Sequence, residues 1–446
     1  MSFLHRLRGF IDRRLQPAYL TFAAGTIVGV TLVLAVVLFA TSDRGKTALG
    51  IPLGADFAGF YVAAQMLNQG ESSRLYDRAR HSELYHELLP YESEREQIPY
   101  VHPPFVAGLL RPLARLPYPT AVAIWLVISG TVYLASMLLM LKTLPWADRQ
   151  QWGLILLLAC SFEPFAFECW LGGQLSAIGF GSYALCWAAL QRSRPVWAGL
   201  ALGICFYKPT LLIVVLPLLV VGRQWRMLLG MTMTGLALAI VSVALVGWDV
   251  NIGYLGELLS FNKSTSGGDL ELRTWKYVDL NNCLRLWLGQ GSSLQLPLLA
   301  ASGLIAGLLL IREWWGGDRL DSDAGRMLWA ATVTWTPVLN LYVGIYDSIL
   351  IVQSILITAT LLNVRAESSA ALTRSGFAYL VSLIFVAPWF SQNLAARTGV
   401  PLYTLLLVSL GVYQLWVLRS LRSHAPADQG MATAEQGLAA ETTAGD

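Results

Sequence analysis

The chain carries few charged residues for its length. Asp, Glu, Lys and Arg make up 13% of 446 residues and hydrophobic residues 55%, whereas about a quarter of a soluble domain is charged. The sequence also lacks a glycine-rich nucleotide loop, a serine-nucleophile motif and metal-ligand spacing among its five cysteines. We therefore expect no cofactor and no metal, and a net charge of +3 gives no indication of a nucleic-acid partner.

The sequence contains many long apolar segments, which predict an all-α polytopic membrane protein. A helix crosses the bilayer with about 20 apolar residues, or fewer where it is short or broken. We expect about twelve spans, at 19–41, 119–141, 151–168, 175–190, 196–207, 209–222, 228–247, 294–311, 327–343, 345–363, 376–392 and 400–418.

Positive residues lie on alternate connections between these spans, which predicts the topology. Under the positive-inside rule both termini face the cytoplasm. Two long loops, 42–118 and 248–293, then lie outside. Residues 1–422 are expected to form a single transmembrane domain, followed by a disordered cytoplasmic tail at 423–446.

The first outer loop contains a carboxylate at the predicted membrane–water boundary. Asp56 begins a predicted helix that ends near Asn68, so it could cap that helix or act as a general base. Phe60 lies on the same helical face and Tyr61 beside it. The later segment 101–117 contains Arg111 and ends at a proline, which favours an interfacial or re-entrant helix over a span.

Lys208 joins two short apolar segments, 196–207 and 209–222. A lysine there is costly in a bilayer and indicates a functional site, although it could also extend its ammonium to the interface. Short, proline-interrupted spans tend to line a cavity enclosed by protein. A lipid phosphate would suit a point cation at this position.

Further polar residues are predicted to lie near the same outer leaflet. His102 opens a His-Pro-Pro turn, Gln174 follows two glycines in a short outer turn, and both could bind a phosphate or a sugar, or be plain turn residues. The remaining candidates for a substrate pocket are Glu168, Asn340, Tyr346 and Asp347. Pairing with Lys208 or Arg111 is the structural explanation for one or two of the acids.

Several of these motifs, in this order, resemble glycosyltransferase family 87, a family of polytopic enzymes with the GT-C fold. The resemblance rests on segments of the N-terminal half: Asp56–Ala64, Leu75-Tyr76-Asp77, His102-Pro103-Pro104-Phe105 with Arg111-Pro112-Leu113 and Trp125, Gly173-Gln174-Leu175, and Ala198-Gly199-Leu200 through Lys208-Pro209 to Arg223. It covers about 55–225 well and the C-terminal half weakly.

The resemblance implies an inverting transfer of a hexose from a polyprenyl-phosphate sugar to a glycolipid or glycan acceptor, without an essential metal. It implies Asp56 as the base, with Lys208 and Gln174 matching the Lys-Pro and Gly-Gln motifs of the family. The lipid phosphate would lie near Lys208, with His102 or Arg111 as further ligands. The enzyme would face the periplasm or exterior from a bacterial inner membrane.

The segment 336–347 departs from the mannosyltransferases of the family because it contains no histidine. Mannose is therefore only the leading candidate for the sugar. Two other interpretations remain open: a secondary transporter or flippase, which would show two related halves and midplane charges, and a non-catalytic partner in a glycolipid assembly complex.

Overall fold

The computed structural model describes residues 16–43, 45–48, 50, 52–89, 100–144, 149–267, 273–289, 291–317, 319–364 and 370–423. Over these residues the chain is helical, with three isolated backbone bridges and no strand. The prediction of an all-α protein is confirmed. All of the predicted tail except its first residue lies outside the described residues.

The helices follow the apolar segments of the sequence closely. In chain order they are α2 (Pro17–Ala40), α3 (Phe57–Asn68), α4 (Arg78–Leu88), α5 (Pro104–Leu110), α6 (Tyr118–Thr143), α7 (Arg149–Ser161), α8 (Ser176–Leu190), α9 (Pro195–Gly203), α10 (Val215–Val221), α11 (Trp225–Val246), α12 (Trp248–Gly267), α13 (Leu280–Leu288), α14 (Gln295–Trp315), α15 (Asp323–Val338), α16 (Leu350–Val364), α17 (Ala370–Val386), α18 (Pro388–Thr398) and α19 (Leu402–Ser423). Short helices η1 to η7 fill the connections, at Ser72–Arg74, Leu113–Arg115, Pro164–Leu171, Ile204–Tyr207, Pro209–Leu212, Thr274–Lys276 and Ile345–Ile349.

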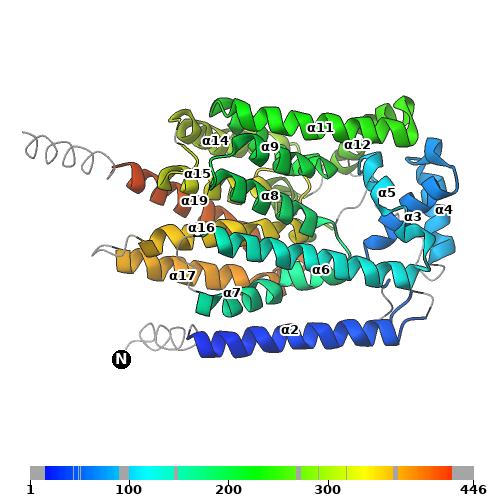
Figure 1. Cartoon of the computed structure of the whole chain (residues 1–446), viewed down its shortest axis with the longest axis horizontal. Coiled ribbons are helices and arrows are strands. Elements are labelled where there is room, and N and C mark those ends of the chain that lie inside the picture. Colours follow the sequence, from blue (N-terminus) through cyan, green and yellow to red (C-terminus); the bar gives the residue numbers. More distant parts are fainter. Residues whose placement is uncertain are drawn as a thin grey trace, which may run out of the picture.

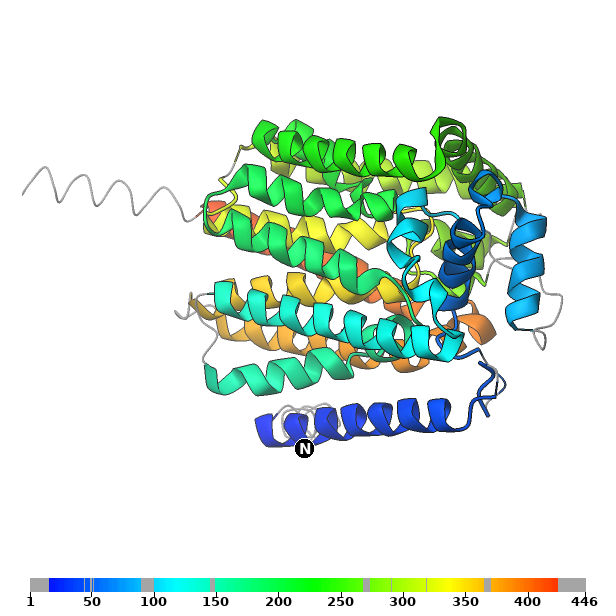
Figure 2. The same cartoon turned by 45° about the vertical axis from the view of Figure 1, so that its right-hand side comes forward.

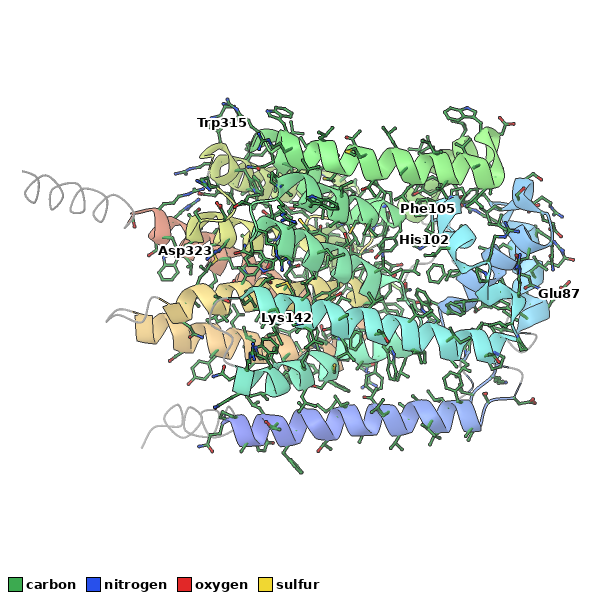
Figure 3. All side chains as sticks on the ribbon, in the orientation of Figure 1. Glu87, His102, Phe105, Lys142, Trp315 and Asp323 are labelled. Carbon is green, nitrogen blue, oxygen red and sulfur yellow. The ribbon has the colours of Figure 1, made fainter. Side chains whose placement is uncertain are left out.

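The long helices lie side by side in one bundle, and the small helices α3, α4 and α5 cover one end of it (Figures 1 and 2). α2 starts and α19 ends at the opposite end of the bundle (Figure 1). The same separation holds for side chains in Figure 3, where Lys142 and Asp323 lie toward the left and His102 and Glu87 toward the right. The described residues of 42–118 and the described chain ends thus lie at opposite ends of the bundle, while the end that faces the cytoplasm stays a prediction.

Six helices among the described residues are long and apolar enough to cross a membrane, and up to eight if each of two bent pairs is one span. The segments predicted as spans at 175–190, 196–207 and 209–222 form shorter apolar helices, at 176–190, 195–207 and 209–221. The chain is therefore a polytopic membrane protein, while the expected number of twelve spans exceeds the number that pass on length and composition.

Both bent pairs break at a proline. α7 and η3 meet at Pro164 with a bend of 57°, and α17 and α18 meet at Pro388 with a bend of 69°. Proline lacks the N–H that an α-helix needs and kinks the chain. η3 is wound as a π-helix, a form that is frequent near functional sites. These bends bring η3 and α18 together at the end of the bundle that carries α3.

α9 and α11 cross at unusually short range because both present glycine. A Cβ atom on Gly199 would overlap the carbonyl oxygen of Met227, and one on Gly230 would overlap that of Val196. Small residues allow helices in lipid to approach backbone to backbone. This contact fixes α9, and with it the turn at Lys208 that follows.

The helices α3, α4 and α5 form a layer of their own at this end of the bundle. α5 has only seven residues and cannot span a bilayer, so the prediction that 101–117 does not cross is supported. Arg78 of α4 donates to Glu257 (2.7 Å) and Ser260 (2.9 Å) of α12. This contact joins the first outer loop to the second.

Candidate functional site

Asp56 occupies the N-cap position of α3, yet its side chain makes no capping hydrogen bond. Its Oδ2 instead accepts a hydrogen bond of 2.6 Å from Nε2 of Gln174. By contrast, Asp77 at the start of α4 caps its helix, accepting from the backbone N–H of Arg80. The carboxylate of Asp56 is therefore directed away from the role that most helix-starting aspartates have.

The backbone around Asp56 is held by the glycine turn that carries Gln174. The N–H of Asp56 donates to the carbonyl oxygen of Gly172 (3.0 Å). Gly173 has φ +72°, and a Cβ there would lie 2.6 Å from the carbonyl oxygen of Gly54. Ala55 has φ +26°, a strained value for a residue with a side chain. Only glycine permits the approach at 173, so the turn fixes where Asp56 lies.

The side chain of Asp56 is exposed to solvent, although protein surrounds it closely enough that burial raises its pKa. The two observations are compatible for a carboxylate below the surface that water reaches from one side. The hydrogen bond from Gln174 lowers the pKa of Asp56, as do the charges of Lys276 and Lys208, while the charge of Glu168 raises it. Four residues from distant segments thus act on this carboxylate.

Lys208 lies between η4 and η5, and its ammonium forms an ion pair with Asp347. The other oxygen of Asp347 accepts a hydrogen bond from Ser176 (2.7 Å). The ammonium also lies 4.7 Å from the centre of the Tyr346 ring, within cation–π range. Lys208, Tyr346 and Asp347 are therefore one cluster, and the structural explanation for Asp347 holds.

His102 lies against Phe60, with ring centres 5.0 Å apart. Its Nδ1 is 3.1 Å from the carbonyl oxygen of Tyr207. A carbonyl oxygen only accepts, so Nδ1 carries the proton. Burial and the charge of Lys208 lower the pKa of His102 to about 4, and the ring is neutral at pH 7. Nε2 is then a hydrogen-bond acceptor in the neutral ring, and donation from His102 to a phosphate stays a prediction.

Glu168 and its partner come from the two bent helices. Oε1 of Glu168, on η3, accepts a hydrogen bond of 2.7 Å from Gln392 on α18. Glu168 is partly exposed and its charge reaches Asp56. The structure therefore brings Glu168 to the cluster, although the C-terminal partner Gln392 was not expected.

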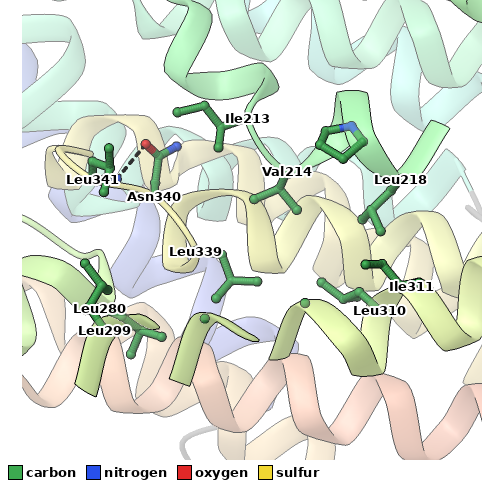
Figure 4. A pocket seen from close by; sticks show the side chains of 13 residues that line it. Ile213, Val214, Leu218, Leu280, Leu299, Leu310, Ile311, Leu339, Asn340 and Leu341 are labelled. Carbon is green, nitrogen blue, oxygen red and sulfur yellow. Dashed lines mark hydrogen bonds between the residues drawn. The ribbon is translucent and has the colours of Figure 1, made fainter. Parts of the chain in front are cut away.

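Asn340 lies at the end of a groove rather than beside Asp56. Its side chain donates to the carbonyl oxygen of Thr210 (2.7 Å), two residues after Lys208. Figure 4 shows the groove, about 310 Å³ in volume, which runs along α10, α14 and the end of α15. Asn340 is its one polar side chain, and the others are apolar residues or glycine: Ile213, Val214, Pro217, Leu218, Leu280, Leu299, Gly303, Gly307, Leu310, Ile311, Leu339 and Leu341.

Two predicted residues lie away from the cluster. Arg111 donates to Asn68 Oδ1 (3.2 Å), at the far end of α3, which is about 18 Å from Asp56 at a rise of about 1.5 Å per residue. Tyr61 is buried and donates to the carbonyl oxygen of Leu116 (2.7 Å). Arg111 and Tyr61 therefore hold α3 against the segment 111–116, and their contact with substrate stays a prediction.

Lys276 is the residue that the sequence-based prediction missed. It ends η6, in the second outer loop, and its charge has a larger effect on Asp56 than that of Lys208. The sequence signal was weak, because a lysine in a loop follows no periodic pattern. Over the described residues, no group of three or more His, Cys, Asp or Glu side chains could hold a metal ion.

The bundle and this cluster define a polytopic membrane protein with acidic and basic groups at the loop-covered end. The sequence profile of glycosyltransferase family 87 matches residues 100–340. The chain belongs to this family and is a membrane glycosyltransferase. The match begins after Asp56 and extends beyond 225, so it differs from the expected range of about 55–225. No curated protein and no solved structure matches the chain significantly.

Proposed function

We propose that the protein transfers a hexose, with mannose as the leading candidate, from a polyprenyl-phosphate sugar to a glycolipid or glycan acceptor at the outer face of a bacterial inner membrane. The observation that carries the proposal is Asp56, a solvent-accessible carboxylate that does not cap its helix and that is oriented by Gln174. Family membership supports the glycosyltransferase class, which sets the transporter interpretation aside.

The proposed reaction is a single displacement. Asp56 accepts the proton of the acceptor hydroxyl as its oxygen forms a bond to the anomeric carbon. The bond from that carbon to the phosphate oxygen breaks on the opposite face, and polyprenyl phosphate leaves with the electron pair. The configuration of the anomeric carbon is inverted, and Asp56 returns its proton to solvent. A raised pKa makes Asp56 a stronger base than an ordinary aspartate.

The apolar groove offers a position for the isoprenoid tail of the donor. Its lining is apolar apart from Asn340, and Asn340 is linked through Thr210 to the turn that bears Lys208. A tail in the groove would therefore end near Lys208 with its phosphate directed toward the charged cluster. The neutral Nε2 of His102 would accept a hydrogen bond from a sugar hydroxyl.

The test supplies purified full-length protein in lipid nanodiscs with a polyprenyl-phosphate mannose and a membrane lipid extract. We expect a new mannosylated product, and none with the Asp56→Asn variant. Polyprenyl-phosphate glucose in a parallel reaction reports the choice of sugar. Product formation by Asp56→Asn at the wild-type rate would overturn the role of Asp56, and absence of product with every donor would overturn the donor class.

A further inference from the structure

Lys208 and Lys276 both act on Asp56, but only one of them is compensated by a partner. Lys208 is paired with Asp347, which in turn accepts from Ser176. Lys276 makes no ion pair and no side-chain hydrogen bond with any described residue. A cation already neutralised by a buried carboxylate attracts a further anion weakly. Of the two lysines that act on Asp56, Lys276 is therefore the one without a direct ion pair among the described residues.

The position of Lys276 is held from two sides. The N–H of Val278 donates to the carbonyl oxygen of Val343 (3.0 Å), and Tyr277 bridges to Gly344. On its other side η6 packs against α18, the helix whose Gln392 binds Glu168. The segment therefore lies between the loop that leads to Asp347 and the helix that orients Glu168.

Lys276 and Asp56 interact through their charges without forming an ion pair. Their charges interact, yet the ammonium and the carboxylate are more than 4.0 Å apart, since they form no ion pair. A base and a leaving group must lie on opposite sides of the reacting carbon, so a sugar ring needs room between them. A direct Lys276–Asp56 ion pair would leave none.

We propose that Lys276 binds the phosphate group of the lipid-phosphate donor and stabilises the polyprenyl phosphate that leaves, while Lys208 chiefly holds Asp347 and the turn in place. This inference rests on the proposed function and names the residue that contacts its donor. As the bond from carbon to phosphate oxygen breaks, negative charge grows on the phosphate. A fixed cation stabilises that charge most where it is not already neutralised. Lysine is a common point-charge ligand for phosphate.

Binding of two probes that differ only in the phosphate tests this assignment. Full-length protein in nanodiscs is titrated with farnesyl phosphate and with farnesol, for the wild type, Lys276→Gln, Lys276→Arg and Lys142→Gln. Lys142 is exposed on the opposite face of the bundle (Figure 3) and is the matched control. We expect Lys276→Gln to weaken farnesyl phosphate binding by about tenfold or more. Farnesol binding should be unchanged, and Lys276→Arg should retain most of the affinity.

The outcomes separate this inference from the function on which it rests. Wild-type affinity of Lys276→Gln for farnesyl phosphate would overturn the role of Lys276 and leave the donor class intact. Equal weakening of farnesol would show a structural role and would also overturn it. A wild-type protein that binds farnesyl phosphate no better than farnesol would overturn the donor class itself. Weakening by Lys142→Gln would show that the effect is not local.

Discussion

The side-chain amide of Gln174 donates to the carboxylate of Asp56 across 2.6 Å, although 118 positions separate the two residues. The hydrogen bond joins the first outer loop to the turn between η3 and α8. It leaves the second oxygen of Asp56 free of this donor. The hydrogen bond also fixes the orientation of the carboxylate, and α3 is not capped by this side chain. A general base requires an oriented carboxylate with an oxygen available to the substrate.

A pair of variants separates catalysis from helix capping. Asp56→Asn should lower sugar transfer by about 10²–10⁴-fold with little effect on thermal unfolding, because the asparagine oxygen can still accept from Gln174 and the side chain caps nothing. Asp77→Ala should retain transfer and lose about 1 kcal/mol of stability, because Asp77 does cap α4. Turnover and unfolding temperature, measured on both variants, check the prediction. The reverse pattern would show that Asp56 is a structural cap.

Removal of the Gln174 amide should change the pH dependence of transfer. Its hydrogen bond lowers the pKa of Asp56, so Gln174→Leu should raise that pKa further. The active form is the carboxylate, and activity falls as pH falls through the pKa. The acidic limb of kcat/KM should therefore move to higher pH. Gln392→Leu, which removes the partner of Glu168 instead, is the matched control. An unmoved limb in Gln174→Leu would contradict the prediction.

The ion pair of Lys208 with Asp347 should dominate the effect of substitutions at Lys208. Asp347 is almost fully buried, so Lys208→Met leaves an uncompensated charge and should cost about 3–5 kcal/mol of stability. The double variant Lys208→Met/Asp347→Asn should recover most of that loss. Thermal unfolding of the single and double variants forms a double-mutant cycle. Additive losses would show that the pair is not coupled.

Gly173 should tolerate no side chain. A Cβ there would lie 2.6 Å from the carbonyl oxygen of Gly54 and 2.7 Å from the Cβ of Phe57, and φ is +72°. Gly173→Ala should displace the turn and reduce both transfer and stability. Gly59→Ala, inside α3 with no atom within 4 Å of the new Cβ, should instead add about 0.5–1 kcal/mol. Activity of Gly173→Ala equal to that of Gly59→Ala would refute this role of the turn.

The helices could be predicted from the sequence wherever an apolar segment is bounded by proline. α2 begins at Pro17 and α6 near Pro119, within two residues of the predicted bounds. The number of spans could not be predicted in this way. Internal prolines such as Pro164 and Pro388 break segments that are mainly apolar, and periodicity cannot show how sharply the two pieces bend.

The site was predictable only in part, and for a physical reason. Asp56, Lys208 and Gln174 stand next to helix breaks or in short turns, where an isolated polar residue is conspicuous against apolar neighbours. Lys276 lies in a polar loop, where a lysine is common and does not stand out from its neighbours in the sequence. Its place beside Asp56 depends on the bridge from Tyr277 to Gly344, a tertiary contact that leaves no local pattern. Arg111 is conspicuous too, but it follows α5 and contacts Asn68, at the end of α3 opposite Asp56.

The groove along α10 and α14 has a kinetic consequence. Apart from Asn340 its walls are apolar side chains and glycine, so a lipid donor bound there, as proposed, would arrive by lateral diffusion among lipids and not from the surrounding buffer. The concentration that governs turnover is then the mole fraction of donor in the leaflet. Diluting nanodiscs in buffer at a fixed donor-to-lipid ratio would leave the rate per enzyme unchanged, whereas adding plain phospholipid to the same membranes would slow it.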